Sequence, residues 1–258
     1  MQATKHRAWV AILTPVLLLV ALAGTPAPAA EPTGTPSISV FAAASLTTAF
    51  RAVAAAFESA HPGTKVDLNF AGSPTLVQQI REGAPADVFA AADEANMQKL
   101  VDAGAIVAPP RIFAHNLLQI VVAKGNPHHI ASLADLTRPG LIVVLCGDTV
   151  PAGRYALETF TKAGVMPPAG SRELDVKAVV SKVALGEADA GVVYVTDVRA
   201  ARDSVEGVGL PATHNVTARY PIAVLREARD AESARAFLDF VLSDPGRKIL
   251  GDYGFLNP

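Results

Sequence analysis

The chain has 258 residues, half of them hydrophobic, with 22 basic and 24 acidic residues and a net charge of −2. This length can bury one or two sizeable cores, and the mildly acidic balance disfavours general binding to nucleic acid. The single cysteine, Cys146, excludes an intramolecular disulfide. It lies in an apolar run, which favours a small buried side chain over a reactive thiol.

The first thirty residues predict a secretory signal peptide. Lys5 and Arg7 give a basic start, Ala8–Ala23 is apolar, and Ala27-Pro28-Ala29 has the small-residue spacing of a cleavage site. The apolar run is shorter than the ~20 residues that a membrane-spanning helix needs. We therefore expect export to the periplasm or to the outer face of the cytoplasmic membrane, with a short disordered leader after the signal peptide.

Apolar runs and amphipathic stretches alternate along the rest of the chain. Strands are predicted for Ile38–Ala43, Lys65–Phe70, Asp87–Ala91, Leu117–Ala123, Leu141–Leu145 and Gly191–Val195. Helices are predicted for Leu46–Ser59, Thr75–Glu82, Asn96–Ala103, Ala156–Lys162, Val176–Leu185 and Glu232–Leu242. This alternation implies a mostly parallel α/β sheet covered on both faces, which binds ligands beyond the carboxyl ends of its strands.

Five segments at or beside these strand–helix junctions offer backbone N–H groups and hydroxyls. They are Ala42–Ser45, Ala71–Pro74, Val150–Gly153, Asp175–Lys177 and Val193-Tyr194. Helix N-termini and hydroxyls bind anions through dipoles and hydrogen-bond donors. The segments therefore predict a receptor for a small, permanently charged oxyanion and argue against a chemical catalyst.

The residues that open the predicted helices have ordinary structural interpretations as well. Ser45, Ser73 and Asp175 are interpreted as N-caps, with Pro74 at the first helical position. A tyrosine such as Tyr194 in an apolar strand usually belongs to the core.

Three other polar features are assigned structural roles. Asp87 is expected to accept hydrogen bonds from turn N–H groups, and Arg154 to pair with a surface carboxylate. His128-His129 is expected in a solvated loop rather than at a metal site. No Gly-x-Ser-x-Gly elbow, phosphate-binding Gly-x-x-x-x-Gly-Lys-Ser/Thr loop or His-Glu-x-x-His motif occurs.

Taken together, the junction segments resemble the periplasmic molybdate-binding proteins of ABC transporters. The resemblance rests on six stretches in family order, namely Val40–Thr47, Phe70–Ile80, Gly83–Phe89, Val150–Ala156, Gly191–Tyr194 and Tyr253–Phe255. It implies an α/β, two-lobed type II periplasmic binding protein fold with a hinge between the lobes. Lobe 1 would comprise residues 31–119 and 220–258, and lobe 2 residues 120–219, with the chain crossing near Gln119 and Tyr220.

The resemblance also implies a ligand set for the oxyanion. The hydroxyls and N–H groups of Ser45 and Ser73, the N–H groups of Ala152 and Val176, and the hydroxyl of Tyr194 would bind it. Molybdate, and tungstate with it, would be held through its oxygens without direct protein–metal ligands and without a cofactor. The implied partner is the membrane permease of an ABC transporter, and the implied protein is a monomer that is not an enzyme and binds no nucleic acid.

Three alternatives remain at this point. The first is a receptor for sulfate or another small oxyanion, which a site made of donors fits almost as well. The second is an exported serine hydrolase using Ser45 or Ser73, although no motif places a histidine or an acid to activate either serine. The third is the effector domain of a transcription regulator, which the signal peptide and the absence of a DNA-binding helix pair disfavour.

The donors themselves favour a fully ionised anion. Molybdate carries four acceptor oxygens and no proton at neutral pH, so a cage of donors suits it. Hydrogen phosphate keeps a proton that would face donors only, and an unmade buried hydrogen bond costs ~1–3 kcal/mol. Sulfate has shorter bonds, so it would make poorer contacts in a pocket sized for molybdate.

Overall fold

The structure is a computed structural model that describes residues 37–258, and these residues belong to one compact unit. The predicted signal peptide and leader lie outside the described residues. The strands are β1 (Ser37–Ala43), β2 (Lys65–Ala71), β3 (Val88–Ala90), β4 (Arg111–Ala123), β5 (Val143–Cys146), β6 (Arg172–Glu173), β7 (Ala190–Tyr194), β8 (Val205–Gly209) and β9 (Thr217–Val224). The α-helices are α1 (Thr47–Ala60), α2 (Ser73–Arg81), α3 (Glu94–Asp102), α4 (Pro151–Lys162), α5 (Val176–Ala184), α6 (Val195–Ala200), α7 (Ala231–Leu242) and α8 (Asp244–Asp252).

The strands form a mixed sheet in the order β2-β1-β3-β9-β4-β7-β5-β6, with β8 paired to β4. Strands β1, β2 and β3 are parallel to one another, as are β5, β6 and β7. All pairs that involve β4 or β9 are antiparallel. The expectation of a mostly parallel sheet was therefore wrong, because β4 and β9 connect the two parallel groups as long antiparallel partners.

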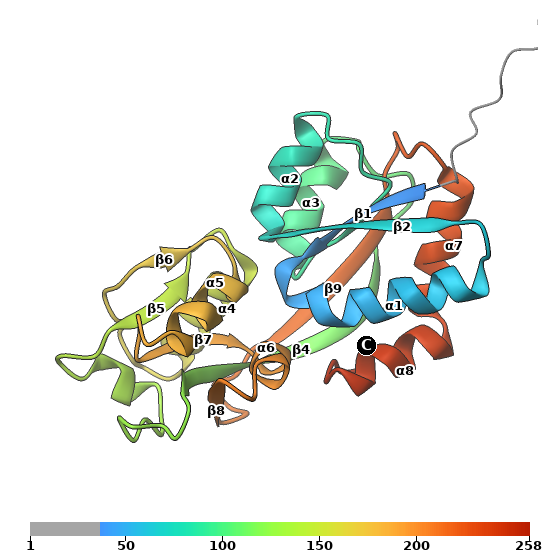
Figure 1. The fold of residues 1–258 in the computed structure, drawn as a ribbon. Helices are drawn as coiled ribbons and strands as arrows, with labels where there is room; N and C mark the ends of the chain where they lie inside the picture. The colour runs from blue at the N-terminus through green and yellow to red at the C-terminus, as the bar shows by residue number, and fades with distance from the viewer. Residues whose placement is uncertain (1–36) are drawn as a thin grey trace, which may run out of the picture. The chain divides into compact units, whose positions relative to one another are not determined.

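Strand β4 belongs to both groups of elements. Its first part, Arg111–Leu117, pairs with β9, and its second part, from Leu118, pairs with β7 and β8. Figure 1 shows β1–β3 with α1–α3 and α7 in one lobe and β5–β7 with α4 and α5 in the other, with β4 and β9 running between them. The fold is thus two-lobed α/β, and the lobe boundaries given above remain a prediction.

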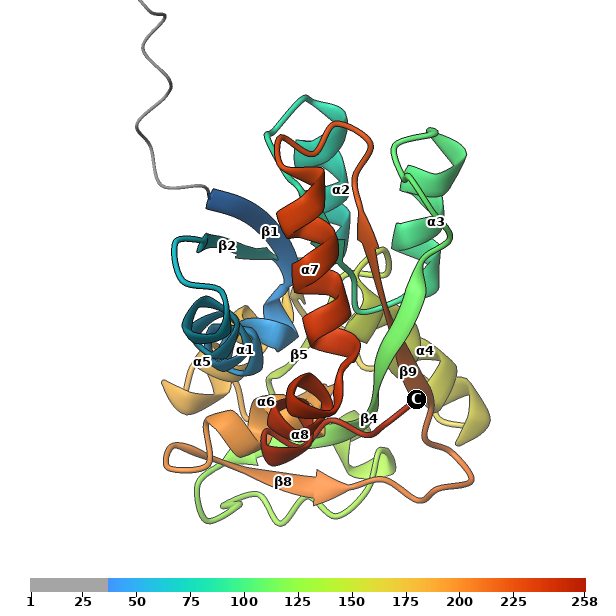
Figure 2. The ribbon, with the colours of Figure 1, turned by 90° about the vertical axis from the view of Figure 1, so that its right-hand side faces the viewer.

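Both faces of the first lobe's sheet are covered at β1, which is buried from Val40 onward. Val40 of β1 belongs to a core cluster with Phe50 of α1 and Phe237 of α7, and α7 lies over β1 and β9 in Figure 2. The next residue, Phe41, belongs to a second cluster with Leu76 of α2. Successive side chains of β1 therefore point to opposite faces of the sheet and contribute to the core on each side.

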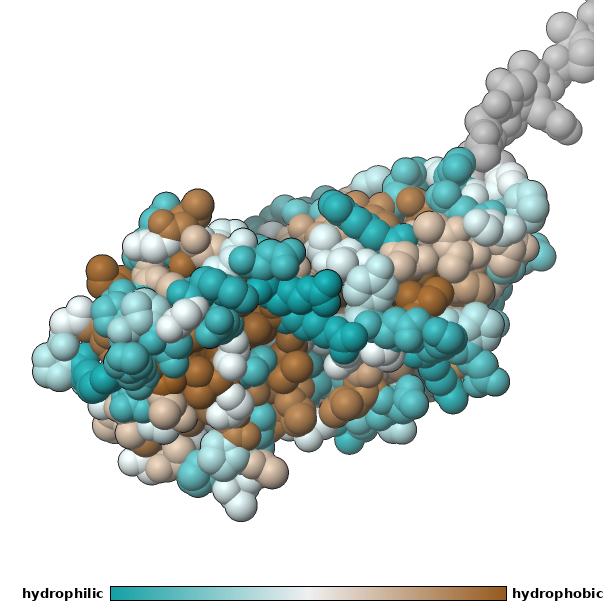
Figure 3. All heavy atoms as spheres, turned by 60° about the horizontal axis from the view of Figure 1, so that its bottom comes forward, coloured by the Kyte–Doolittle hydropathy of each residue, from teal (hydrophilic) through white to brown (hydrophobic). Residues whose placement is uncertain are grey.

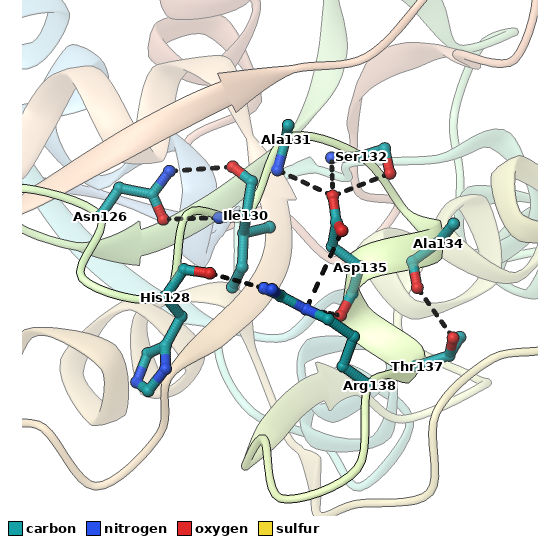
Figure 4. Close-up of polar contacts among 9 residues, drawn as sticks. All are labelled: Asn126, His128, Ile130, Ala131, Ser132, Ala134, Asp135, Thr137 and Arg138. Atoms are coloured by element: carbon teal, nitrogen blue, oxygen red, sulfur yellow. Dashed lines mark hydrogen bonds and ion pairs between the residues drawn. The ribbon is translucent and has the colours of Figure 1, made fainter.

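Side-chain hydrogen bonds hold the loop after β4 (Figure 4). The Asn126 amide donates to the carbonyl of Ile130 at 2.9 Å and accepts from its N–H at 3.0 Å. Asp135 accepts from the N–H groups of Ala131 and Ser132, and these bonds lower the pKa of its carboxyl. His128 is partly exposed and pairs with Asp189. Within residues 37–258, no cluster of three or more histidine, cysteine or acidic side chains is placed to hold a metal.

The surface mixes polar and apolar residues. On the face drawn in Figure 3, hydrophilic residues form a band across the middle and hydrophobic residues gather in small groups beside it. Among the described helices, none combines the length and the apolar character needed to cross a membrane.

Candidate functional site

The five residues predicted to bind the oxyanion all line one small cavity. Ser45 lies in a single 3₁₀ turn (Ala44–Leu46) after β1, and Ser73 begins α2 after β2. Ala152 and Val176 lie at the starts of α4 and α5, and Tyr194 ends β7. Each is at most 6% exposed. Their proximity agrees with the prediction, while their role as ligands remains a prediction.

The cavity has a volume of ≈ 10 Å³, close to the ~10–15 Å³ that one water-sized sphere takes up. Its lining comes from both lobes, with Ala43, Ala44, Gly72 and Ala92 on one side and Val150, Pro151 and Asp175 on the other. Small side chains therefore let the backbone approach the cavity. A ligand that fills it is a compact group of a few atoms rather than a sugar or a peptide.

Three helix N-termini meet at this cavity, and their first N–H groups have no partner within their own helix. Helices α2 and α4 each have proline in the first turn and no side-chain cap, so no capping side chain occupies their amides. Helix α5 is capped by Asp175, as predicted. Its carboxylate accepts from the N–H groups of Lys177 and Ala178, at 2.8 and 3.0 Å, and not from that of Val176.

The two serines are not N-caps, which corrects the sequence-based interpretation. Gly72 is the N-cap of α2, and Leu46 is that of α1. Neither serine hydroxyl bonds back to the first turn of its helix. Ser73 Oγ instead accepts from the N–H of Ala92 at 3.1 Å, and Ser45 Oγ lies 3.0 Å from the hydroxyl of Tyr220. Ser73 thus uses its oxygen as an acceptor for a distant amide and not for its own helix.

The hydroxyl of Tyr194 has no hydrogen-bond partner, although the side chain is fully buried. An unsatisfied buried polar group costs free energy, typically ~1–3 kcal/mol, so such groups are rare in folded proteins. Burial also raises the pKa of this phenol far above its ordinary value, so the hydroxyl remains protonated. Because Tyr194 lines the cavity, its proton is available to an acceptor bound there.

Two basic residues near the cavity form ion pairs with buried carboxylates. Arg154 of α4 lies 2.5 Å from Asp93, the N-cap of α3. The expected pairing of Arg154 is thus confirmed, but its partner is a fully buried carboxylate rather than a surface one. Lys177 pairs with buried Asp197 at 2.9 Å. The cavity lining includes no arginine or lysine, and its one charged side chain is the carboxylate of Asp175, which accepts from two N–H groups of α5. An anion there is therefore held by dipoles and hydrogen-bond donors and not by a cation.

The Arg154–Asp93 ion pair joins the two lobes close to the cavity. Burial raises the pKa of the Asp93 carboxyl, while the Asn96 amide and the Arg154 guanidinium oppose the shift. The side-chain amide of Asn96 also donates to the carbonyl of Thr149 at 3.4 Å. Helices α3 and α4 are therefore linked by two polar contacts beside the cavity.

The glycine at position 72 allows a close backbone contact between the lobes. A Cβ atom added to Gly72 would lie 2.2 Å from the carbonyl oxygen of Leu174, which precedes Asp175. Any side chain at position 72 would collide with that backbone. The residue before Ser73 thus permits the backbone of one lobe to reach that of the other.

Two of the remaining predictions concern buried polar residues away from the cavity. Asp87 accepts from the N–H groups of Ser39 and Arg229, each at 2.6 Å, which confirms its structural role. Cys146 is buried, and burial raises the pKa of its thiol well above the ordinary value. It is therefore a core residue rather than a reactive one.

Tyr220, Asn116 and Asp93 are functional candidates that the sequence did not reveal. Tyr220 lies in β9, for which no strand was predicted. Its contact with Ser45 spans 175 positions in the sequence. No local pattern signals such a contact, and only the sheet order brings β9 beside β3.

Comparison with known proteins identifies the class. Residues 38–256 match the family model described as bacterial extracellular solute-binding protein. The chain therefore belongs to this family of solute-binding proteins, which are not enzymes.

A curated relative narrows the class further. The chain is 41% identical over 259 residues to the molybdate-binding protein ModA of Mycobacterium tuberculosis, covering 97% of this chain and 99% of the relative. Among solved structures, the sulfate-binding protein SubI from Mycobacterium tuberculosis has a TM-score of 0.78 at 22% identity, covering 85% of this chain and 86% of that one. The Azotobacter vinelandii periplasmic molybdate-binding protein has a TM-score of 0.74 at 19% identity, covering 86% and 99%. These two structures support the fold.

Proposed function

We propose that this protein captures molybdate, and tungstate with it, outside the cytoplasm and delivers it to the permease of an ABC transporter. The observation that carries the proposal is the buried cavity where three helix starts, two serines and the unpartnered hydroxyl of Tyr194 converge. A dianion that accepts from all of them removes the cost of the unmet donor. The similarity to ModA proteins supports molybdate over other tetrahedral oxyanions.

The chemistry of the site is recognition without reaction. The serine hydroxyls bond to Tyr220 and to the amide of Ala92, and neither partner is a base that could activate a nucleophile. The N–H dipoles of α2, α4 and α5 stabilise negative charge without supplying a full positive one. Release to a permease then requires the lobes to separate, because every predicted ligand is buried.

Isothermal titration calorimetry of the purified protein tests the proposal. We expect molybdate and tungstate to bind and hydrogen phosphate to bind at least a hundredfold more weakly, because its proton faces donors. Sulfate is the second candidate, since it is also a fully ionised tetrahedral anion. Hydrogen phosphate within tenfold of molybdate would contradict the donor cage, and tighter binding of sulfate would assign the protein to sulfate.

A further inference from the structure

Tyr220 lies directly behind Ser45 without lining the cavity. It is fully buried, and the rings of Phe113, Tyr194 and Phe255 pack edge-on against it at centroid distances of 5.4–6.2 Å. Its hydroxyl is 3.0 Å from Ser45 Oγ, and the distance alone leaves open which oxygen donates. The neighbours of Tyr220 decide the direction.

Asn116 fixes that direction. Its Oδ1 accepts from the N–H of Leu117 at 3.0 Å, so the opposite atom of the amide is Nδ2, which can only donate. This nitrogen lies 2.8 Å from Thr196 Oγ1 and 3.4 Å from Tyr220 Oη. Tyr220 therefore accepts from Asn116, which cannot accept in return. The neighbouring hydroxyl of Tyr194 makes no hydrogen bond, so Ser45 Oγ is the acceptor within hydrogen-bond distance of the Tyr220 proton among the described residues. Ser45 accepts that proton, and its own is free to point into the cavity.

The hydroxyl oxygen of Ser73 is also an acceptor toward the protein, but its partner is a backbone N–H group. Ser73 Oγ accepts from the backbone N–H of Ala92, and an N–H group cannot accept in return. The polarity of Ser73 is therefore fixed by the backbone. The hydrogen-bond direction at Ser45 depends on the side chain of Tyr220, and so a mutation can change it.

We infer that Tyr220 is a specificity-determining residue that holds Ser45 as a hydrogen-bond donor and so excludes anions that carry a proton. The inference rests on the proposed function. With Tyr220 in place, the lone pair of Ser45 that faces the phenol is occupied and the serine proton is directed to the ligand. The O–H of hydrogen phosphate then faces a donor at Ser45 instead of an acceptor. With phenylalanine in its place, both lone pairs are free and the hydroxyl can rotate to accept.

The test compares binding of three anions to the wild type and to Tyr220→Phe by calorimetry at pH ~8, where phosphate is mainly the hydrogen phosphate dianion. Loss of orientation at Ser45 should weaken molybdate and sulfate by a similar factor, roughly threefold to tenfold. The ratio of the Kd for hydrogen phosphate to the Kd for sulfate should fall by about tenfold. A merely structural loss would move all three anions together and leave that ratio unchanged.

Tyr253→Phe is the matched control, because it also removes one phenol hydroxyl and Tyr253 is not in contact with Ser45 by any hydrogen bond among the described residues. It should leave the ratio as in the wild type. A second variant, Asn116→Ala, keeps Tyr220 but removes the donor that orients it, and it should lower the ratio in the same direction. It provides the test if Tyr220→Phe does not fold.

A double-mutant cycle assigns the effect to Ser45. In a Ser45→Ala background, Tyr220→Phe should no longer change the ratio. An unchanged ratio in both Tyr220→Phe and Asn116→Ala, with molybdate still bound by the wild type, would overturn the inference and leave the proposed function standing. A wild-type protein that binds none of the three anions would overturn both.

Discussion

The hydroxyls of Ser45 and Ser73 each supply one donor beyond the backbone at the cavity. Ser45→Ala and Ser73→Ala keep the backbone N–H groups and lose the hydroxyls. Hydrogen bonds to a charged group contribute ~1.5–3 kcal/mol, so each variant should bind molybdate roughly tenfold to a hundredfold more weakly. Calorimetric titration of each single variant and of the double variant measures this.

The serine variants need a control for folding, because both side chains are buried. Their thermal melting curves without ligand should stay close to that of the wild type. A ligand seen only by the folded state adds about 2.7 kcal/mol at 100 times its Kd. If both variants are folded and still bind molybdate like the wild type, the site assignment is wrong.

Tyr194→Phe should have opposite effects on stability and on binding. Without ligand, it removes a buried hydroxyl that has no partner, so the free protein should become more stable by about 1 kcal/mol. With molybdate, it removes a donor, so binding should weaken by about tenfold or less, since water can partly replace the lost bond.

Urea unfolding of the Tyr194→Phe variant with and without molybdate measures both effects. Tyr155→Phe is the comparison, because Tyr155 is a partly buried tyrosine outside the predicted ligand set. This variant should not show the opposed pair of changes. A Tyr194→Phe protein that is less stable without ligand would mean that the hydroxyl is satisfied in the free protein.

At the scale of helices and strands, the ion pair between the start of α3 and helix α4 predicts a pH-dependent stability. Arg154→Ala leaves the fully buried carboxylate of Asp93 without its cation. Loss of one partner of a buried pair costs ~3–5 kcal/mol. Because Arg154 is 41% exposed, we expect a smaller loss, about 1–2 kcal/mol at neutral pH.

The sign of the pH dependence follows from the raised pKa of the Asp93 carboxyl. A carboxyl whose pKa is higher in the folded state binds its proton more tightly there, so its ionisation costs stability as pH rises through that pKa. The deficit of Arg154→Ala should therefore be largest near pH ~7 and shrink as the pH falls toward about 4. Denaturation at several pH values measures it, and Lys248→Ala, which breaks an exposed pair with Asp252, should show no such trend.

The elements that the sequence predicted are those with a strong local pattern. Ile38–Ala43 and Lys65–Phe70 agree with β1 and β2 to within one residue at each end. Strand β4 begins six residues before the predicted Leu117, because His115 and Asn116 interrupt its apolar pattern. Strands β6, β8 and β9 and helices α6 and α8 were missed, since they are short or mix polar residues with apolar ones.

The five predicted ligand residues come together at one cavity, where backbone and hydroxyl donors follow strands, and their role as ligands stays a prediction. Ser45 and Ser73 were found from such junctions, but their caps were misassigned because a serine at a helix start is usually a cap. The partners that orient them come from distant segments. The position of Tyr220 follows from the pairing of β9 with β3 and β4. Such long-range pairing cannot be predicted from local periodicity.

For the whole molecule, Gly72→Ala should hinder closure of the lobes. The added Cβ would lie 2.2 Å from the Leu174 carbonyl oxygen, so the two backbones would have to move apart. The φ angle of Gly72, −58°, suits alanine, so the free protein should remain stable. We expect molybdate binding to weaken by more than tenfold, because the donors of the two lobes no longer converge.

Small-angle scattering separates this effect from an ordinary loss of stability. The wild type should contract when molybdate binds, by hinge closure, whereas Gly72→Ala should contract less. Gly209→Ala is the control, because a Cβ there meets nothing within 4 Å. Equal contraction of Gly72→Ala and the wild type would show that position 72 does not limit closure.

The position of β9 in the sheet also has a consequence for the order of folding. Strand β9, Thr217–Val224, lies between β3 and β4, so the first lobe cannot complete its sheet until nearly the whole chain has been synthesised. Until then β3 and β4 have unpaired edges, which are open to other chains, and pairings over such sequence distances form slowly. The sheet of the first lobe is therefore completed late in synthesis, and the residues from Thr217 onward are indispensable to the strands that come first in the chain.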